Sequence, residues 1–109
     1  MTVKNLTLEN YEDEVVNSDL PVLVDFHADW CGPCQMMKPV FEELSEEYTG
    51  KVKFMKLDTQ AEEGLAVKFK IQGIPTLVVV KGDEEIHRFV GFMGKDQLKQ
   101  HIDYVLEAH

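Results

Sequence analysis

Residues 30–34 read Trp30-Cys31-Gly32-Pro33-Cys34, and they hold both cysteines of the chain. An apolar, β-prone run gives way here to a helical pattern, which places the two cysteines at positions i and i+3 on the first turn of a helix. At that spacing the pair can form a disulfide or bind one metal ion. A disulfide across so few residues closes almost no loop and adds little stability. A pair that opens and closes without the fold depending on it suits a redox centre.

Length and charge limit the classes of function. The chain has 109 residues, of which 44% are hydrophobic, and this fits one globular domain over residues 1–109. Its 20 Asp and Glu residues outnumber its 11 Lys and Arg residues, so the formal net charge is -9. Because such a field repels polyanions, we expect no nucleic-acid partner.

Cysteine content and hydropathy indicate where the protein works. Two cysteines do not make the disulfide framework of a small secreted domain, and C-x-x-C near a βαβ pattern is a redox signal in a cytosolic protein. The first residues contain no apolar signal core, and no apolar run approaches the length of a membrane span. We therefore expect a cytoplasmic protein without a membrane anchor.

The apolar periodicities predict a mixed α/β protein. They indicate five strands, at residues 3–6, 22–28, 52–57, 76–81 and 85–90. They indicate four helices, at residues 8–16, 33–48, 61–69 and 95–106, the first capped by Thr7 and with Leu8, Tyr11, Val15 and Val16 on its apolar face. Strands separated by helices imply parallel crossovers, whereas the turn at Gly82-Asp83 implies an antiparallel hairpin.

Four features together resemble the thioredoxin family. They are the WCGPC motif at a strand-to-helix junction, Asp25 before it, the Gly73-Ile74-Pro75-Thr76 stretch, and Gly91 near the end of the chain. The resemblance covers essentially the whole chain. It implies a central mixed sheet with helices on both faces, and a general disulfide reductase whose dithiol is regenerated by a thioredoxin reductase. The implied partners are disulfide-containing proteins, the implied state is a monomer, and no bound cofactor is needed.

The two cysteines are expected to have different roles. Cys31 lies at the mouth of the helix, where free N–H groups and the dipole favour a thiolate, so we expect it to attack the substrate. The dipole alone contributes roughly 0.3–1 kcal/mol, so hydrogen bonds to the sulfur must add to it. Cys34 lies one turn deeper, is expected to be more buried, and fits the resolving role. The alternatives to a redox pair are a metal site and a chemically inert cysteine pair. Zinc needs four ligands, and the chain has no second C-x-x-C.

Two charged residues in neighbouring strands are expected to move protons. Asp25 interrupts an apolar strand, so burial should raise its pKa. By resemblance, it is the buried aspartate that accepts a proton from Cys34, directly or through water. Lys56 matches the family lysine that tunes this aspartate. The alternatives are an Asp at an exposed strand edge and a solvated strand lysine.

The remaining site residues follow from the resemblance. It makes Pro75 a cis proline facing the dithiol, although only about 5–6% of X-Pro bonds are cis. The residue before it would offer its backbone to an extended substrate segment, as in strand addition. The expected substrate-binding residues are Trp30, Gly32, Pro33, Ile74, Pro75, Thr76, Gly91 and Phe92.

Three positions depart from the common family pattern. His27 stands where an aromatic residue, usually Trp, is frequent, and Gln35 stands where a basic residue often follows the motif. Phe92 stands where a small residue often follows the glycine. For His27 a packing or surface role is slightly favoured over an electrostatic one.

The sequence therefore predicts a thiol–disulfide oxidoreductase that reduces protein disulfides. A disulfide oxidant or isomerase is the second enzymatic interpretation, and the Gly32-Pro33 dipeptide argues against it. From a different class, the chain would be a binding or scaffold subunit that uses the fold and not the thiols.

Overall fold

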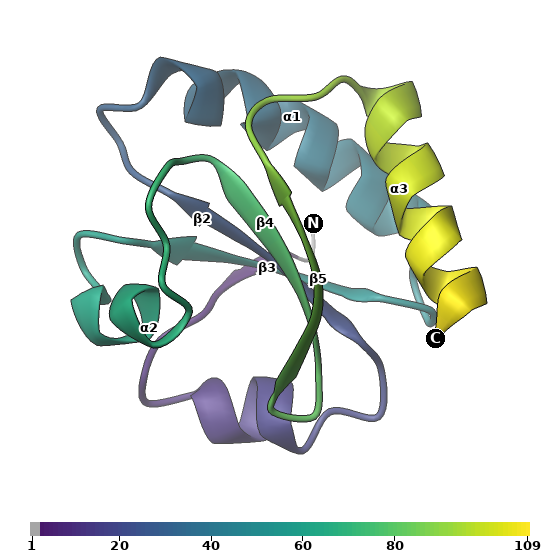
Figure 1. Ribbon diagram of the computed structural model, residues 1–109, viewed down its shortest axis with the longest axis horizontal. Coiled ribbons are helices and arrows are strands. Elements are labelled where there is room, and N and C mark those ends of the chain that lie inside the picture. Colours follow the sequence, from purple (N-terminus) through teal and green to yellow (C-terminus); the bar gives the residue numbers. More distant parts are fainter. Residues whose placement is uncertain (1–2) are drawn as a thin grey trace.

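Five strands form one mixed sheet in the computed structural model, which describes residues 3–109 (Figure 1). The strand order is β1-β3-β2-β4-β5. Strands β1, β3 and β2 run parallel, whereas β4 is antiparallel to both β2 and β5. The bounds are β1 Lys4–Asn5, β2 Val22–His27, β3 Lys53–Asp58, β4 Thr76–Lys81 and β5 Glu84–Val90. The predicted strands are thus confirmed to within two residues at each end.

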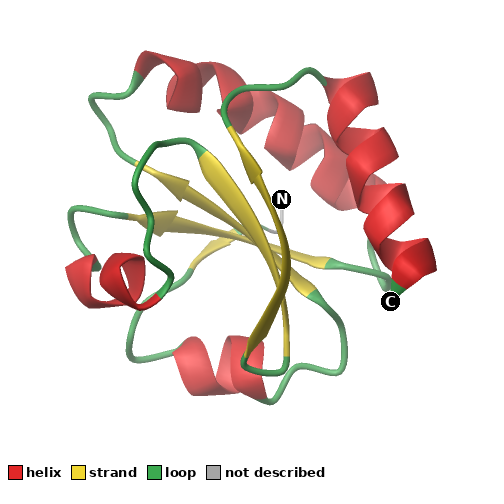
Figure 2. Cartoon of the chain, viewed as in Figure 1, coloured by secondary structure: helices red, strands yellow, loops and turns green. Residues whose placement is uncertain are grey.

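Helices cover both faces of this sheet, as the resemblance implied (Figure 2). The helical elements are η1 Glu12–Val16, α1 Gly32–Glu47, α2 Glu63–Lys68 and α3 Lys95–Ala108. Helices α1 and α3 pack on one face, where Phe41, Leu44 and Leu98 belong to one buried cluster. Elements η1 and α2 pack on the other face, where Val15 and Leu65 belong to a second cluster. The sheet therefore separates two apolar cores.

Strand β2 is central and contributes to both cores. Its side chains alternate, so Val22, Val24 and Phe26 join the η1/α2 core while Leu23 joins the α1/α3 core. Asp25 and His27 share the parity of Leu23 and therefore face α1.

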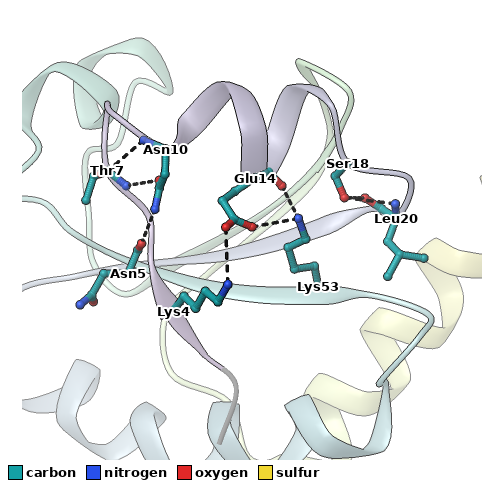
Figure 3. A network of polar contacts seen from close by, with 8 residues as sticks. All are labelled: Lys4, Asn5, Thr7, Asn10, Glu14, Ser18, Leu20 and Lys53. Carbon is teal, nitrogen blue, oxygen red and sulfur yellow. Dashed lines mark hydrogen bonds and ion pairs between the residues drawn. The ribbon is translucent and has the colours of Figure 1, made fainter.

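The first helical segment differs from its prediction. The regular element η1 begins only at Glu12, and Leu8, expected on the buried face, is 69% exposed. Thr7 still makes a capping contact, because its Oγ1 accepts the N–H of Asn10 at 3.2 Å while Asn10 Oδ1 accepts the N–H of Thr7 (Figure 3). These two hydrogen bonds hold residues 7–10 in a turn, so Leu8 does not join the buried apolar face of the helix.

Polar contacts fix η1 against the sheet. Lys53 Nζ donates to the Glu14 carbonyl at 2.7 Å and pairs with its carboxylate at 3.1 Å (Figure 3). Tyr11 Oη donates to Asp83 at 2.5 Å, which joins this segment to the β4–β5 turn. Gly82 adopts φ +65° in that turn, a conformation that other residues rarely adopt.

No helix within residues 3–109 is both long enough and apolar enough to cross a membrane.

Candidate functional site

The two cysteines form a disulfide at the N-terminus of α1. Their Cα atoms are 5.2 Å apart, within the range usual for a disulfide. Cys31 is the N-cap residue, with extended backbone angles, and Gly32 and Pro33 begin the helix. Pro33 suits the first turn because the N–H that proline lacks would have no helical partner there. The local sequence thus places both sulfurs at the positive end of a helix.

The Cys31 sulfur has a backbone donor aimed at it. The N–H of Cys34 donates to Cys31 Sγ at 3.2 Å. A donor in this position would stabilise a thiolate at Cys31 once the disulfide is reduced. The helix dipole alone stabilises a thiolate only weakly, and this contact is a hydrogen bond to the sulfur of the kind expected to add to it.

The expectation that Cys34 is more buried than Cys31 is wrong for the disulfide form. Each residue is 4% exposed, and both pack with Ala28 and the half-buried Ile74. The prediction used only the positions of the cysteines along the helix. It could not take into account that the segment before β4 covers the N-terminus of α1. The environments still differ, because Cys31 Sγ lies 3.7 Å from the Ile74 carbonyl oxygen whereas Cys34 lines a polar pocket.

Two large apolar side chains adjoin the segments that hold the disulfide, since Trp30 precedes Cys31 and Phe92 follows Gly91. Trp30 is 69% exposed and Phe92 is 43% exposed, although both are large apolar side chains. The Ile74–Pro75 peptide bond is cis, as the resemblance implied. Gly91, at φ +96°, donates its N–H to the Pro75 carbonyl at 2.8 Å. This bond connects the end of β5 to the proline loop, and so brings the two rim segments together.

Thr76 differs from the other residues that the resemblance assigns to substrate binding. Its side chain is 2% exposed, and its hydroxyl donates to the Gly73 carbonyl at 2.5 Å. Its side chain therefore braces the proline loop from inside and is not part of the exposed rim.

Asp25 lines a small pocket that Cys34 also lines. It is 4% exposed, its Oδ1 has no hydrogen-bond partner, and it pairs in register with Lys56 of β3. The pocket has about 50 Å³ of water-accessible volume. One water needs about 10–15 Å³, so there is room to bridge two polar groups. The pocket is lined by Asp25, His27, Asp29, Cys34, Gln35, Lys38, Phe41 and Lys56.

The burial of Asp25 has the predicted electrostatic effect. Desolvation raises the pKa of its carboxyl from 3.8 to about 7, and the positive charge of Lys56 opposes part of that rise. A carboxyl with a pKa near neutrality exchanges protons readily under physiological conditions. The structure thus brings a proton-exchanging group, a lysine and Cys34 to one pocket.

Sequence reasoning missed two charged members of this pocket, Asp29 and Lys38, and the apolar Phe41. Lys38 was findable, because it follows Cys34 by four residues in α1 and residues at that spacing share a helix face. Asp29 lies in the short connection between β2 and α1, and no periodicity predicts where such a side chain points.

A disulfide that opens and closes transfers two electrons, and here it lies at the N-terminus of a helix, where Cys34 lines the same pocket as a proton-exchanging carboxyl. The fold and this site define the class of thiol–disulfide oxidoreductases.

Comparison with known proteins narrows the class to a family. A family model described as Thioredoxin matches residues 2–104. Thioredoxin C-2 of Corynebacterium nephridii is 45% identical over 102 residues, which cover 94% of each chain. Thioredoxin of Porphyra purpurea is 39% identical over 103 residues, covering 94% of this chain and 96% of that protein. The chain belongs to the thioredoxin family.

Some relatives are longer than this chain. Thioredoxin Y1, chloroplastic, of Arabidopsis thaliana is 44% identical over 105 residues, and the chain spans only 61% of its length.

Proposed function

We propose that this chain is a single-domain protein-disulfide reductase in which Cys31 attacks and Cys34 resolves. The observation that carries the proposal is the position of the disulfide, with Cys31 capping the N-terminus of α1 and Cys34 lining the pocket of Asp25.

The reaction has two exchange steps. In the first, the Cys31 thiolate attacks one sulfur of the substrate disulfide, the substrate S–S bond breaks, and a substrate thiolate leaves and takes a proton from solvent. In the second, Cys34 loses its proton and its thiolate attacks Cys31 Sγ. The mixed disulfide breaks, the Cys31–Cys34 bond forms, and the second substrate thiolate leaves. Two electrons pass from the protein dithiol to the substrate.

Asp25 serves the second step. Its carboxylate accepts the Cys34 proton through a water in the pocket, and its pKa of about 7 keeps both protonation states populated at neutral pH. Lys56, paired in register with it, tunes this carboxyl by holding its pKa below the value that burial alone would give.

The rim around the disulfide binds the substrate. The exposed Trp30 and Phe92 supply apolar contacts, while Gly32 and Pro33 shape the helix mouth beside the sulfurs. Ile74, the residue before the cis proline Pro75, presents its backbone to an extended segment. Gly91 and the buried Thr76 hold that loop.

Substrates are proteins with accessible disulfides, and a thioredoxin reductase regenerates the dithiol. The protein acts as a monomer in the cytoplasm. Relatives named as chloroplastic make a plastid the competing location, and tagging the protein in its own cells distinguishes the two.

An insulin-reduction assay tests the reductase proposal. The wild type should precipitate reduced insulin in the presence of dithiothreitol, and the double variant Cys31→Ser, Cys34→Ser should be no faster than dithiothreitol alone. Replacement of the exposed Met36 by Leu, which leaves both sulfurs in place, is the matched control. Equal rates for the wild type and the double variant would support the scaffold alternative.

A further inference from the structure

His27 lines the Asp25 pocket, and the proposed function does not use its chemistry. It is half-buried, and its Nε2 is buried without a hydrogen-bond partner. Buried ring nitrogens are normally paired with a protein group or with water. His27 lines a space with room for a water, and a water held there would give this nitrogen the partner that it lacks.

The backbone holds His27 firmly in this position. Its carbonyl accepts the N–H of Thr59 at 2.8 Å and the Thr59 hydroxyl at 3.0 Å. It is also the last residue of β2, two positions after Asp25 on the same face. Same-face neighbours lie about 6.6 Å apart along a strand, a gap that one bridging water can span.

Two spaces meet at His27. The first is the small pocket that contains Asp25 and Cys34. The second is an open groove of about 350 Å³, which also contains Asp58 and Glu62 but neither Asp25 nor Cys34. Four residues line both spaces: His27, Asp29, Lys38 and Lys56. Of these, only the imidazole both accepts and donates a proton near neutral pH.

We propose that His27 relays protons between Asp25 and the open groove, so that the proton that Asp25 takes from Cys34 leaves the pocket within the resolution step and does not return to the Cys34 thiolate. The inference rests on the proposed function, because it requires Asp25 to accept the Cys34 proton. The transfer is balanced: protonated Asp25 gives its proton to neutral His27 through water, and the imidazolium releases that proton to solvent in the groove. No electrons move in the relay.

The surroundings of His27 favour the neutral imidazole before it accepts a proton. Burial is the largest influence and lowers the pKa of the imidazole; Lys56 of β3 and Lys38 of α1 act in the same direction. Asp58 of β3 and Asp29 after β2 oppose them. The remaining charged groups that face the two spaces are Asp25 beside it and Glu62 across the groove. A neutral imidazole is the form that can accept a proton.

A two-phase reaction with Ellman's reagent isolates the relevant step. Attack by Cys31 releases the first thionitrobenzoate at a rate proportional to reagent concentration, and resolution by Cys34 releases the second at a rate independent of it. In His27→Phe, which keeps an aromatic ring, the second phase at pH 7 should slow on the order of tenfold, less than the roughly 10²–10⁴-fold of a direct general base. The first phase should be unchanged.

Chemical rescue separates a relay from a packing role. In His27→Ala, added imidazole should accelerate the second phase in proportion to its concentration. His87→Ala removes a histidine of β5 that lines neither space, and it should show wild-type rates with no response to imidazole.

Three outcomes overturn the relay in distinguishable ways. Wild-type second phases in both His27 variants, with a slow second phase in Asp25→Asn, would refute the relay and leave the proposed function standing. Slowing of both phases without imidazole rescue would make His27 a packing residue. A wild-type second phase in Asp25→Asn would remove the proton-accepting role of Asp25, and the relay with it.

Discussion

Replacing Asp25 with asparagine measures the free energy that burial of its carboxylate costs the fold. The side chain is 4% exposed and its Oδ1 lacks a partner, so the charged form has lost its hydration without a hydrogen bond at that oxygen in return. Asparagine keeps the volume and cannot ionise. We expect Asp25→Asn to be more stable than the wild type at neutral pH, and to lose that advantage in acid.

The magnitude follows from the pKa of the carboxyl. At 1.36 kcal/mol per pKa unit, the difference between 3.8 and about 7 corresponds to about 4 kcal/mol. A buried amide left without full hydrogen bonding costs roughly 1–3 kcal/mol, which offsets part of that gain in stability. The variant should therefore be more stable than the wild type by about 1–3 kcal/mol above pH 7.

The sign of the pH dependence is fixed by linkage. Between pH 3.8 and about 7 the folded wild type holds a proton at Asp25 that the unfolded chain has released. Wild-type stability from this group is therefore fully present below pH 3.8, falls as pH rises, and levels off above about 7. The variant lacks this carboxyl, so its stability has no pH-dependent contribution from position 25.

Urea unfolding of the oxidised proteins from pH 4 to pH 8.5 measures this difference, since the oxidised form has no thiol titration. The difference in unfolding free energy should grow steadily toward neutrality and then flatten. Asp13→Asn removes an exposed negative charge and controls for the change in net charge. A difference that stays constant across this range, or a variant less stable than the wild type at pH 8, would contradict the electrostatic reasoning.

Three further predictions concern the surroundings of the site. Lys56→Met should raise the pKa of Asp25 further, because the positive charge of Lys56 opposes its rise. An NMR titration of the Asp25 carboxyl measures this pKa, and an unchanged pKa would show that the lysine has no influence. Trp30→Ala should change unfolding free energy by less than about 0.5 kcal/mol, because the side chain is exposed, while raising KM for insulin; an unchanged KM would remove it from the rim. Tyr48→Phe deletes the hydroxyl that donates to Asp103 and joins α1 to α3, and should cost about 1 kcal/mol in urea unfolding, since the freed carboxylate can hydrate. An unchanged midpoint would show that this bond contributes nothing.

Periodicity predicted most of the fold because burial pattern and backbone geometry agree in the central elements. The bounds of β4 and the start of α3 match their predictions, and both elements contribute fully buried side chains such as Leu77 and Leu98. The first helical segment was predicted less well. Leu8 continues the helical spacing, yet the Thr7–Asn10 turn holds it outside the core. A local polar turn overrides hydrophobic spacing there, and spacing alone cannot detect it.

The site shows the same division between local and long-range information. The position of the cysteines at a strand-to-helix junction and the burial of Asp25 were predicted from strand and helix patterns. The role of Lys56 was implied only by the family resemblance, and its register pairing with Asp25 comes from the structure. The equal burial of Cys31 and Cys34 was not, because it depends on a loop more than forty residues away that covers the helix mouth. The second space behind His27 likewise exists only where β2, β3, α1 and the segment before α2 come together.

Trapping with single-cysteine variants tests the central claim most directly. With purified protein substrates or a cell extract, Cys34→Ser should accumulate long-lived mixed disulfides on non-reducing gels, because Cys31 attacks and no thiol resolves the product. Cys31→Ser should trap almost none, since Cys34 faces the Asp25 pocket. Equal trapping by both variants, or trapping by Cys31→Ser alone, would contradict the assignment of Cys31 as nucleophile and Cys34 as resolving thiol.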